Sequence, residues 1–137
     1  MALAPNVIDT YARTIWGEAR GEGELGMQAV ANVIYNRVQR SGWWGSDIVG
    51  VCRKPWQFSC WNDNDPNKEK LLNVTESDEQ FKECLSLASR AVDGELPDLT
   101  NGSDSYFDCR MPKPPSWAAN ASMRAVIGHH IFFKTRF

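Results

Sequence analysis

The sequence predicts one α+β domain over residues 1–137, mainly helical and ending in a small antiparallel sheet. Three observations favour this fold class. The chain has 137 residues, 42% hydrophobic and 23% charged, which is the size and composition of one globular domain. Apolar residues recur at helical spacing over residues 7–38 and again after residue 77. Short strand-like runs appear only after Pro97.

Two amphipathic helices are expected at the start of the chain. Residues 7–20 place their apolar side chains along one stripe of a helix. The sequence GEG at 21–23 favours a turn. A second apolar stripe predicts another helix over residues 25–38. The two helices should therefore meet at a tight glycine-rich corner.

The middle of the chain predicts a long structured loop followed by two helices. Residues 41–66 are rich in Gly, Trp, Ser, Asn, Asp and Pro, with room for one short helix near Ile48–Val51. Asp65-Pro66 has the pattern of a cap followed by a first-turn proline, which predicts a helix over 65–72. The sequence SDEQ at 77–80 fits a capping box, and the helix that follows should end at Gly94.

Two short strands are expected in the last third of the chain. They cover SYFD at 105–108 and HIFF at 130–133. The proline-rich stretch between them, MPKPP at 111–115, cannot form regular hydrogen-bonded structure because proline lacks an N–H donor. The strands should pair as a small antiparallel sheet.

Charge and hydropathy exclude several partners. The net charge is −2, whereas sequence-independent binding of nucleic acid needs a basic face. No apolar run is long enough to span a bilayer, so we expect no stable membrane association, and we expect a monomer. Residues 1–6 carry neither a basic nor an apolar segment of a signal peptide. This predicts synthesis in the cytoplasm.

The cysteines and histidines do not form a recognisable metal site. Adjacent residues on a strand point to opposite faces, so His129 and His130 would not share one ion. We therefore expect no metal and no cofactor. The four cysteines lack C-x-x-C spacing and are compatible either with free thiols or with two disulfides. They are Cys52, Cys60, Cys84 and Cys109.

Two glutamates in the corner are candidate catalytic residues. Glu18 falls in the last turn of the first helix between small residues, where the helix dipole favours the protonated carboxyl that a general acid requires. Glu22 follows four residues later, and on a continuous helix the pair could flank a glycosidic bond. Gly21 interrupts that continuity. The alternatives are a surface ion pair for Glu18 and a capping or salt-bridging role for Glu22.

The loop carries aromatic and polar side chains suited to sugar binding. Trp43, Trp44, Trp56 and Trp61 could stack on sugar rings, and Gln57 and Ser59 could hydrogen-bond to them. The alternative is that these tryptophans attach the loop to the core.

Several motifs together resemble one family. IWGEARGE at 15–22 and GMQAVANVIYNRV at 26–38 resemble the opening of the SleB-type cell-wall hydrolases, which include spore-cortex-lytic enzymes and phage endolysins. QFS at 57–59, the segment 102–107 and IGHHIFF at 127–133 match later family elements in the same order. The sequence departs from the family pattern at Trp16, His129 and Phe133.

The resemblance implies a lysozyme-like fold and a peptidoglycan substrate. It also implies that Glu18 is the catalytic acid, and that cleavage between N-acetylmuramic acid and N-acetylglucosamine leaves a 1,6-anhydro end, as in lytic transglycosylases. Gln57, Ser59, Trp61, Tyr106 and Trp44 are the candidates for binding the glycan, and Glu22 for orienting the corner.

Two functional alternatives stay open at this point. Glu18 could instead activate water, as in a lysozyme-type muramidase. A non-catalytic glycan-binding module would keep the fold and the tryptophans but would not need an acid at the corner. Among enzymes, a phage-type endolysin that waits in the host cytoplasm fits residues 1–6 better than a secreted spore enzyme, and the alternative is a virion-borne or housekeeping wall hydrolase.

Overall fold

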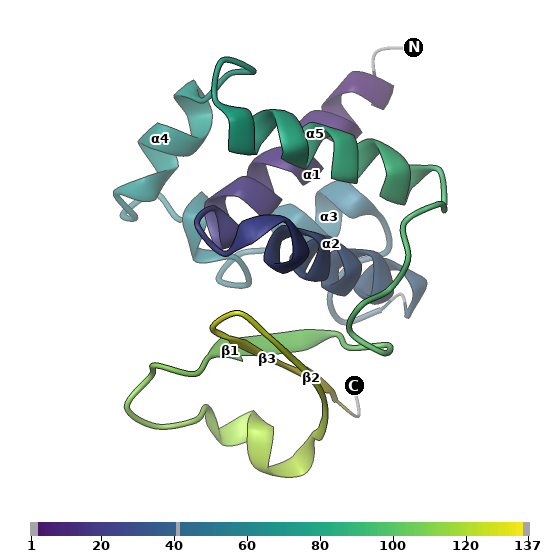
Figure 1. Cartoon of the computed structure of the whole chain (residues 1–137), viewed down its shortest axis with the longest axis vertical. Coiled ribbons are helices and arrows are strands. Elements are labelled where there is room, and N and C mark those ends of the chain that lie inside the picture. The colour runs from purple at the N-terminus through teal and green to yellow at the C-terminus, as the bar shows by residue number, and fades with distance from the viewer. Residues whose placement is uncertain (1–2, 41, 136–137) are drawn as a thin grey trace.

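The computed structural model describes residues 3–40 and 42–135. Within them, helices form the upper part of the molecule and a sheet lies below (Figure 1). No described helix is both long and apolar enough to cross a bilayer. The α-helices are α1 (Leu3–Ala19), α2 (Gly23–Gln39), α3 (Ile48–Arg53), α4 (Asn67–Asn73) and α5 (Glu79–Val92). The 3₁₀ turns and strands are η1 (Ser59–Trp61), β1 (Ser105–Asp108), η2 (Ser116–Asn120), β2 (Ser122–Ile127) and β3 (His130–Lys134).

The predicted α+β class, mainly helical with a small antiparallel sheet, is confirmed. Helix α1 is central and packs against the other four helices. Tyr11 and Ile15 on its apolar stripe are fully buried. The Tyr11 hydroxyl donates a hydrogen bond of 2.6 Å to the Ala31 carbonyl of α2. Helix α1 thus ends at a fixed position in the core.

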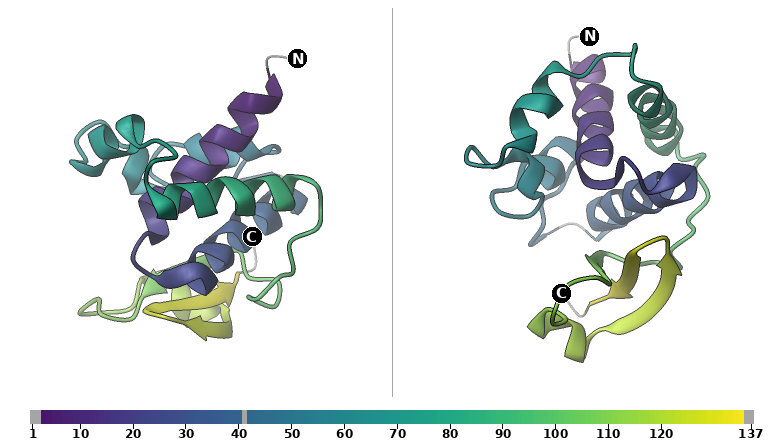
Figure 2. Two further views of the ribbon diagram at one scale, coloured as in Figure 1. Left: turned by 45° about the horizontal axis from the view of Figure 1, so that its top comes forward. Right: turned by 60° about the vertical axis from the view of Figure 1, so that its left-hand side comes forward.

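The sheet packs on α2 through one aromatic residue. Its strands run antiparallel in the order β1-β3-β2, and both views of Figure 2 place it against the helical part on the side of α2. Phe132 of β3 is fully buried against Ala29 and Val33 of α2. Tyr106 of β1 lies opposite Phe132 in the register, with the two ring centroids 5.5 Å apart. Phe132, held against α2, therefore fixes the position of the neighbouring Tyr106 ring.

A buried polar cluster completes the junction between α2 and the sheet. Asp104, fully buried just before β1, forms an ion pair with Arg40 of α2. It also accepts hydrogen bonds from the backbone N–H (3.1 Å) and the hydroxyl (3.0 Å) of Thr135. Arg37 Nε donates to the Asp104 carbonyl at 2.6 Å. These bonds attach both ends of the sheet to one helix.

Two details differ from the sequence-based expectation. Asp78, not Ser77, caps α5: its carboxylate accepts from Phe81 N at 3.0 Å, while Gln80 accepts instead from Gly21 N at 2.7 Å. Strand β2 was not expected, because SMRAVI mixes polar and apolar residues and leaves several exposed. Hydrogen bonds to β3 stabilise this segment as a strand. They form only when the chain is folded, so the local sequence does not predict them.

Candidate active site

Glu18 lies in the last full turn of α1, next to the corner that joins α1 to α2. The helix ends at Ala19, and the turn is made at Gly21 and Gly23, whose φ angles are +90° and +85°. These positive angles favour glycine, which has no Cβ to clash. Glu18 is partly buried, so its carboxyl is shielded from bulk water while remaining accessible. Because the helix stops here, Glu18 and Glu22 do not share one helix face.

Two residues from distant segments lie against the Glu18 carboxyl. The Tyr106 hydroxyl donates to Glu18 Oε1 at 2.6 Å. The backbone N–H and thiol of Cys60 in η1 face the same carboxyl and lower its pKa. Cys60 can come this close because residue 17 is glycine: a Cβ there would lie 2.8 Å from both Cβ and Sγ of Cys60. The site is thus assembled from the end of α1, from η1 and from the sheet.

Burial determines the direction in which the Glu18 pKa is shifted. Desolvation raises it above the ordinary value of 4.5, and this effect exceeds the lowering by the bonds from Tyr106 and Cys60 and by the charge of Arg37. Glu18 therefore keeps its proton to a higher pH than an exposed glutamate does. A protonated carboxyl with three positioned neighbours can act as a general acid.

Arg37 is a site residue that the sequence analysis did not select. Its side chain is only 6% exposed and its guanidinium lies over the rings of Trp44 (5.4 Å) and Phe58 (5.0 Å). Nη1 is buried without a hydrogen-bond partner among the described residues. The positive charge favours the Glu18 carboxylate that forms after proton transfer. An arginine within the apolar stripe of residues 26–38 was the available signal.

A pocket of about 290 Å³ opens beside Tyr106. We call it the Tyr106 pocket. None of its lining residues is a carboxylic acid, so the protein groups facing a ligand there are aromatic, amide, hydroxyl or cationic. The lining consists of Arg37, Trp43, Trp44, Trp56, Gln57, Ser105, Tyr106 and Trp117.

A second pocket, of about 380 Å³, adjoins the first. We call it the Lys54 pocket, and its side chains include Arg53, Lys54, Trp56, Trp61, Asp63 and Lys68. Trp56 lines both pockets.

The structure places the predicted glycan-binding residues in different positions. Gln57, Trp44 and Tyr106 line the Tyr106 pocket, with Trp44 almost wholly buried in its wall. Trp61 lines the Lys54 pocket. Ser59 begins η1, is exposed and lines neither pocket.

Glu22 is bound to the turn between β2 and β3. One carboxylate oxygen accepts from His129 N at 2.9 Å and the other lies 3.1 Å from His129 Nδ1. The backbone bond from His129 is the largest effect that lowers the Glu22 pKa below 4.5. Gly128 allows the approach, because a Cβ there would lie 2.7 Å from Glu22 Oε1. Glu22 thus joins the helical corner to the sheet.

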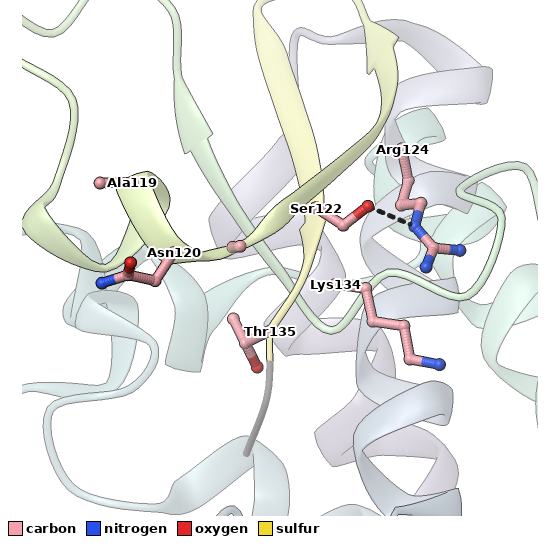
Figure 3. A pocket seen from close by; sticks show the side chains of 7 residues that line it. Ala119, Asn120, Ser122, Arg124, Lys134 and Thr135 are labelled. Atoms are coloured by element: carbon pink, nitrogen blue, oxygen red, sulfur yellow. Dashed lines mark hydrogen bonds between the residues drawn. The ribbon is translucent and has the colours of Figure 1, made fainter.

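The sheet region carries a separate hollow. A third hollow, of about 420 Å³, lies between η2, β2 and β3, with Arg124 and Lys134 beside it (Figure 3). It shares no lining residue with the Tyr106 pocket.

In the part of the chain that the structure describes, no three His, Cys, Asp or Glu side chains gather in a way that could hold a metal ion.

The comparison with known families agrees with this geometry. The sequence model described as "Cell Wall Hydrolase" matches residues 21–133. The chain belongs to the cell wall hydrolase family. It is therefore an enzyme that degrades cell-wall peptidoglycan, and the substrate class implied by its motifs is confirmed.

Two solved structures resemble this hydrolase over nearly its whole length. One is the catalytic domain of the germination-specific lytic transglycosylase SleB from Bacillus anthracis, 29% identical, with a TM-score of 0.70 and 94% of each chain covered. The other is the catalytic domain of the Bacillus cereus SleB protein, 28% identical, with a TM-score of 0.73, covering 96% of this chain and 91% of that one. The resemblance to SleB-type hydrolases and the lysozyme-like fold are confirmed. No curated protein sequence matches the chain.

The positions where the hydrolase departs from its family pattern have visible structural roles. Trp16 is 6% exposed, and its indole N–H donates to Asp78 at 3.3 Å. His129 binds Glu22. Phe133 stacks on Phe107 with centroids 5.5 Å apart. The matched family segment begins at residue 21, so the assignment of Glu18 depends on the geometry described above.

Tyr106→Phe should move the alkaline limb of the pH–activity profile to higher pH. The Tyr106 hydroxyl lowers the Glu18 pKa, so its removal lets Glu18 keep its proton further into the alkaline range. We expect kcat to fall roughly tenfold, because a hydrogen bond to a charged group is worth about 1.5–3 kcal/mol. Turbidity loss of a wall suspension, measured across pH, gives both quantities. A shift to lower pH would contradict the assignment of the bond.

Proposed function

We propose that this cell wall hydrolase is a lytic transglycosylase with Glu18 as its only acid and base. The bond cleaved is that between N-acetylmuramic acid and N-acetylglucosamine. The observation that carries the proposal is a glutamate of raised pKa that is hydrogen-bonded to Tyr106, a residue lining a pocket whose wall contains no carboxylate. The similarity to a SleB domain described as a lytic transglycosylase supports the same reaction.

The proposed reaction uses the Glu18 carboxyl group twice, first as an acid and then as a base. Glu18 protonates the glycosidic oxygen, the bond from that oxygen to the muramic C1 breaks, and positive charge develops at C1. The glycan's own acetamido group can stabilise that charge. The C6 hydroxyl of the same muramic ring then bonds to C1 and gives its proton to the Glu18 carboxylate. Glu18 returns to its protonated form, and no water is consumed.

Hydrolysis would place a different demand on the site. An inverting hydrolase needs a second carboxylate about 6.5–9.5 Å from the acid, and a retaining hydrolase needs one at about 5–5.5 Å. Glu22 has both oxygens bound to His129, and Asp47 caps α3 by accepting from Gly50 N at 2.7 Å. Attack by the C6 hydroxyl needs no such group, because the sugar ring already holds the nucleophile in place.

The polar and aromatic wall of the Tyr106 pocket is the proposed glycan site. Gln57 offers an amide for sugar hydroxyls, and the exposed rings of Trp43 and Trp56 offer faces for stacking. Trp44, predicted as a direct contact, is almost wholly buried in the wall of this pocket. Trp61 and Ser59 stay predictions for contacts farther along the strand.

The reaction products test this proposal. We expect purified peptidoglycan digested by the enzyme to release fragments with 1,6-anhydro-muramic ends. Such fragments are lighter by one water than the hydrolysed ones, so mass spectrometry distinguishes them. Muramic ends that are all hydrolysed would identify a lysozyme-type muramidase instead.

We also propose that the enzyme is a phage-type endolysin, held in the host cytoplasm until a holin opens the membrane. Support comes from Cys52, Cys60, Cys84 and Cys109, which are all free thiols, as is usual in a reducing compartment. Co-expression in bacteria with and without a holin tests the role. Lysis should require both proteins, and lysis by the enzyme alone would contradict it.

A further inference from the structure

The two pockets are connected through a single exposed side chain. Trp56 is 75% exposed and lines both the Tyr106 pocket and the Lys54 pocket. A polymer bound beside Tyr106 that runs past this indole enters the second pocket. Trp56 also has a φ angle of +69°, which is unusual for a bulky residue.

Trp61, the second tryptophan of the Lys54 pocket, is held in place by two contacts. The Trp61 indole N–H donates at 2.8 Å to the hydroxyl of Thr14, which is fully buried in α1. The guanidinium of Arg53 lies over the Trp61 ring at 4.2 Å. The helix that carries Glu18 thus also sets the orientation of this wall.

The charge of the pocket is opposite to that of the whole chain. Arg53, Lys54 and Lys68 line it beside one carboxylate, Asp63, while the chain as a whole has a net charge of −2. Lys68 forms an ion pair with Asp63. Neither Arg53 nor Lys54 forms an ion pair within residues 3–40 and 42–135. Lys54 Nζ lies 5.4 Å from the centre of the Trp43 ring, as Arg53 lies over Trp61, so both cations contact aromatic faces and neither is neutralised by a carboxylate of the described residues.

We propose that the Lys54 pocket binds a carboxylate of the peptide stem that peptidoglycan carries on muramic acid. This inference rests on the proposed function, because the glycan in the Tyr106 pocket brings the stem to Arg53 and Lys54. A neutral sugar would not need the two cations, whereas stem peptides carry free carboxylates at regular intervals along the strand. The pocket would make the enzyme prefer strands that still carry their peptides.

The test compares one glycan with and without its stems. Wall strands are divided in two, and an amidase removes the peptides from one half. The wild type and the double variant Arg53→Gln/Lys54→Gln are assayed on both halves, with Lys82→Gln/Arg90→Gln of α5 as a control of equal charge change. We expect the wild type to cleave stem-bearing strands roughly three- to tenfold faster in kcat/KM, as two partly exposed ion pairs would allow. The double variant should lose this preference and keep its rate on stripped strands, while the control should match the wild type.

Each other result has a definite meaning. Equal rates of the wild type on both substrates would overturn the stem proposal, as would a preference that survives in the double variant. An equal loss on both substrates in the double variant would show that the pocket binds sugar instead. Absence of cleavage by the wild type on either substrate would refute the proposed function itself. Trp56→Ala should lower the rate on both substrates, because the stacked sugar is common to them.

Discussion

Glu18→Gln should abolish wall lysis while leaving the protein folded. The amide keeps the shape of the side chain and can still accept the Tyr106 hydroxyl bond, but it cannot give a proton to the glycosidic oxygen. General acid catalysis is typically worth about 10²- to 10⁴-fold in rate. The measurement is the initial rate of turbidity loss in a peptidoglycan suspension, at equal concentrations of folded protein.

The matched control is Glu22→Gln, four residues along the same corner. Glu22 binds His129 rather than the pocket, so its substitution should loosen the β2–β3 turn and cost clearly less activity. Equal losses in the two variants would favour a two-carboxylate mechanism. A Glu18→Gln enzyme within a few-fold of the wild type would show that Glu18 is not the acid.

The stability of Glu18→Gln should separate catalysis from folding. The Glu18 pKa is raised in the folded state, so the native protein binds this proton more tightly than the unfolded chain does. The resulting stabilisation is complete below the ordinary value of 4.5 and is lost as pH rises through the folded pKa. We therefore compare the urea midpoint of the glutamine variant with that of the wild type at each pH. The difference, variant minus wild type, should be larger above that pH than in acid. The opposite trend would mean that the site favours the carboxylate.

Asp104→Asn should produce the largest loss of stability among single polar substitutions at the helix–sheet junction. The carboxylate is fully buried, binds Arg40 and accepts two hydrogen bonds from Thr135. Breaking a buried ion pair on one side costs about 3–5 kcal/mol, and we expect about 3 kcal/mol because Arg40 is partly exposed. Urea denaturation gives the free energy of unfolding directly.

Asp9→Asn is the control for the Asp104 experiment. Asp9 also pairs with an arginine, Arg13, but its side chain is 48% exposed. Exposed pairs contribute about 0–1 kcal/mol, so this variant should stay close to the wild type. Activity should fall in Asp104→Asn under conditions where the chain is still folded, because Tyr106 belongs to the attached sheet. Similar free energies for the two variants would contradict the role of the junction.

The helical half of the fold follows from local sequence patterns. Residues 7–20 and 25–38 carry their apolar side chains at the spacing of one helix face, and the glycines at the corner favour a turn, so α1 and α2 could be predicted. The capping of α5 was placed one residue early, since Ser77 and Asp78 are both good caps and only the fold directs Gln80 to Gly21. Strand β2 depends on pairing with β3, which local sequence does not encode.

The site was predictable only in part, because it too depends on contacts between segments that are distant in sequence. Glu18 could be selected because its position at a helix end and its neighbours are local features. Its partners come from distant segments: Tyr106 lies 88 residues away in sequence, and Cys60 approaches only because Gly17 leaves space. Arg37 was missed because an arginine in a helix is usually solvent-exposed, whereas here the loop aromatics Trp44 and Phe58 cover it.

The titration of Glu18 tests the central claim most directly. Carboxyl carbon chemical shifts of ¹³C-labelled glutamates, followed by NMR across pH, give one curve per residue, and the Glu18→Gln spectrum assigns the curve of Glu18. We predict a pKa above 4.5 for Glu18 that coincides with the alkaline limb of the pH–activity profile, and a pKa below 4.5 for Glu22. A Glu18 pKa at or below 4.5, or an activity limb that does not follow it, would contradict the account.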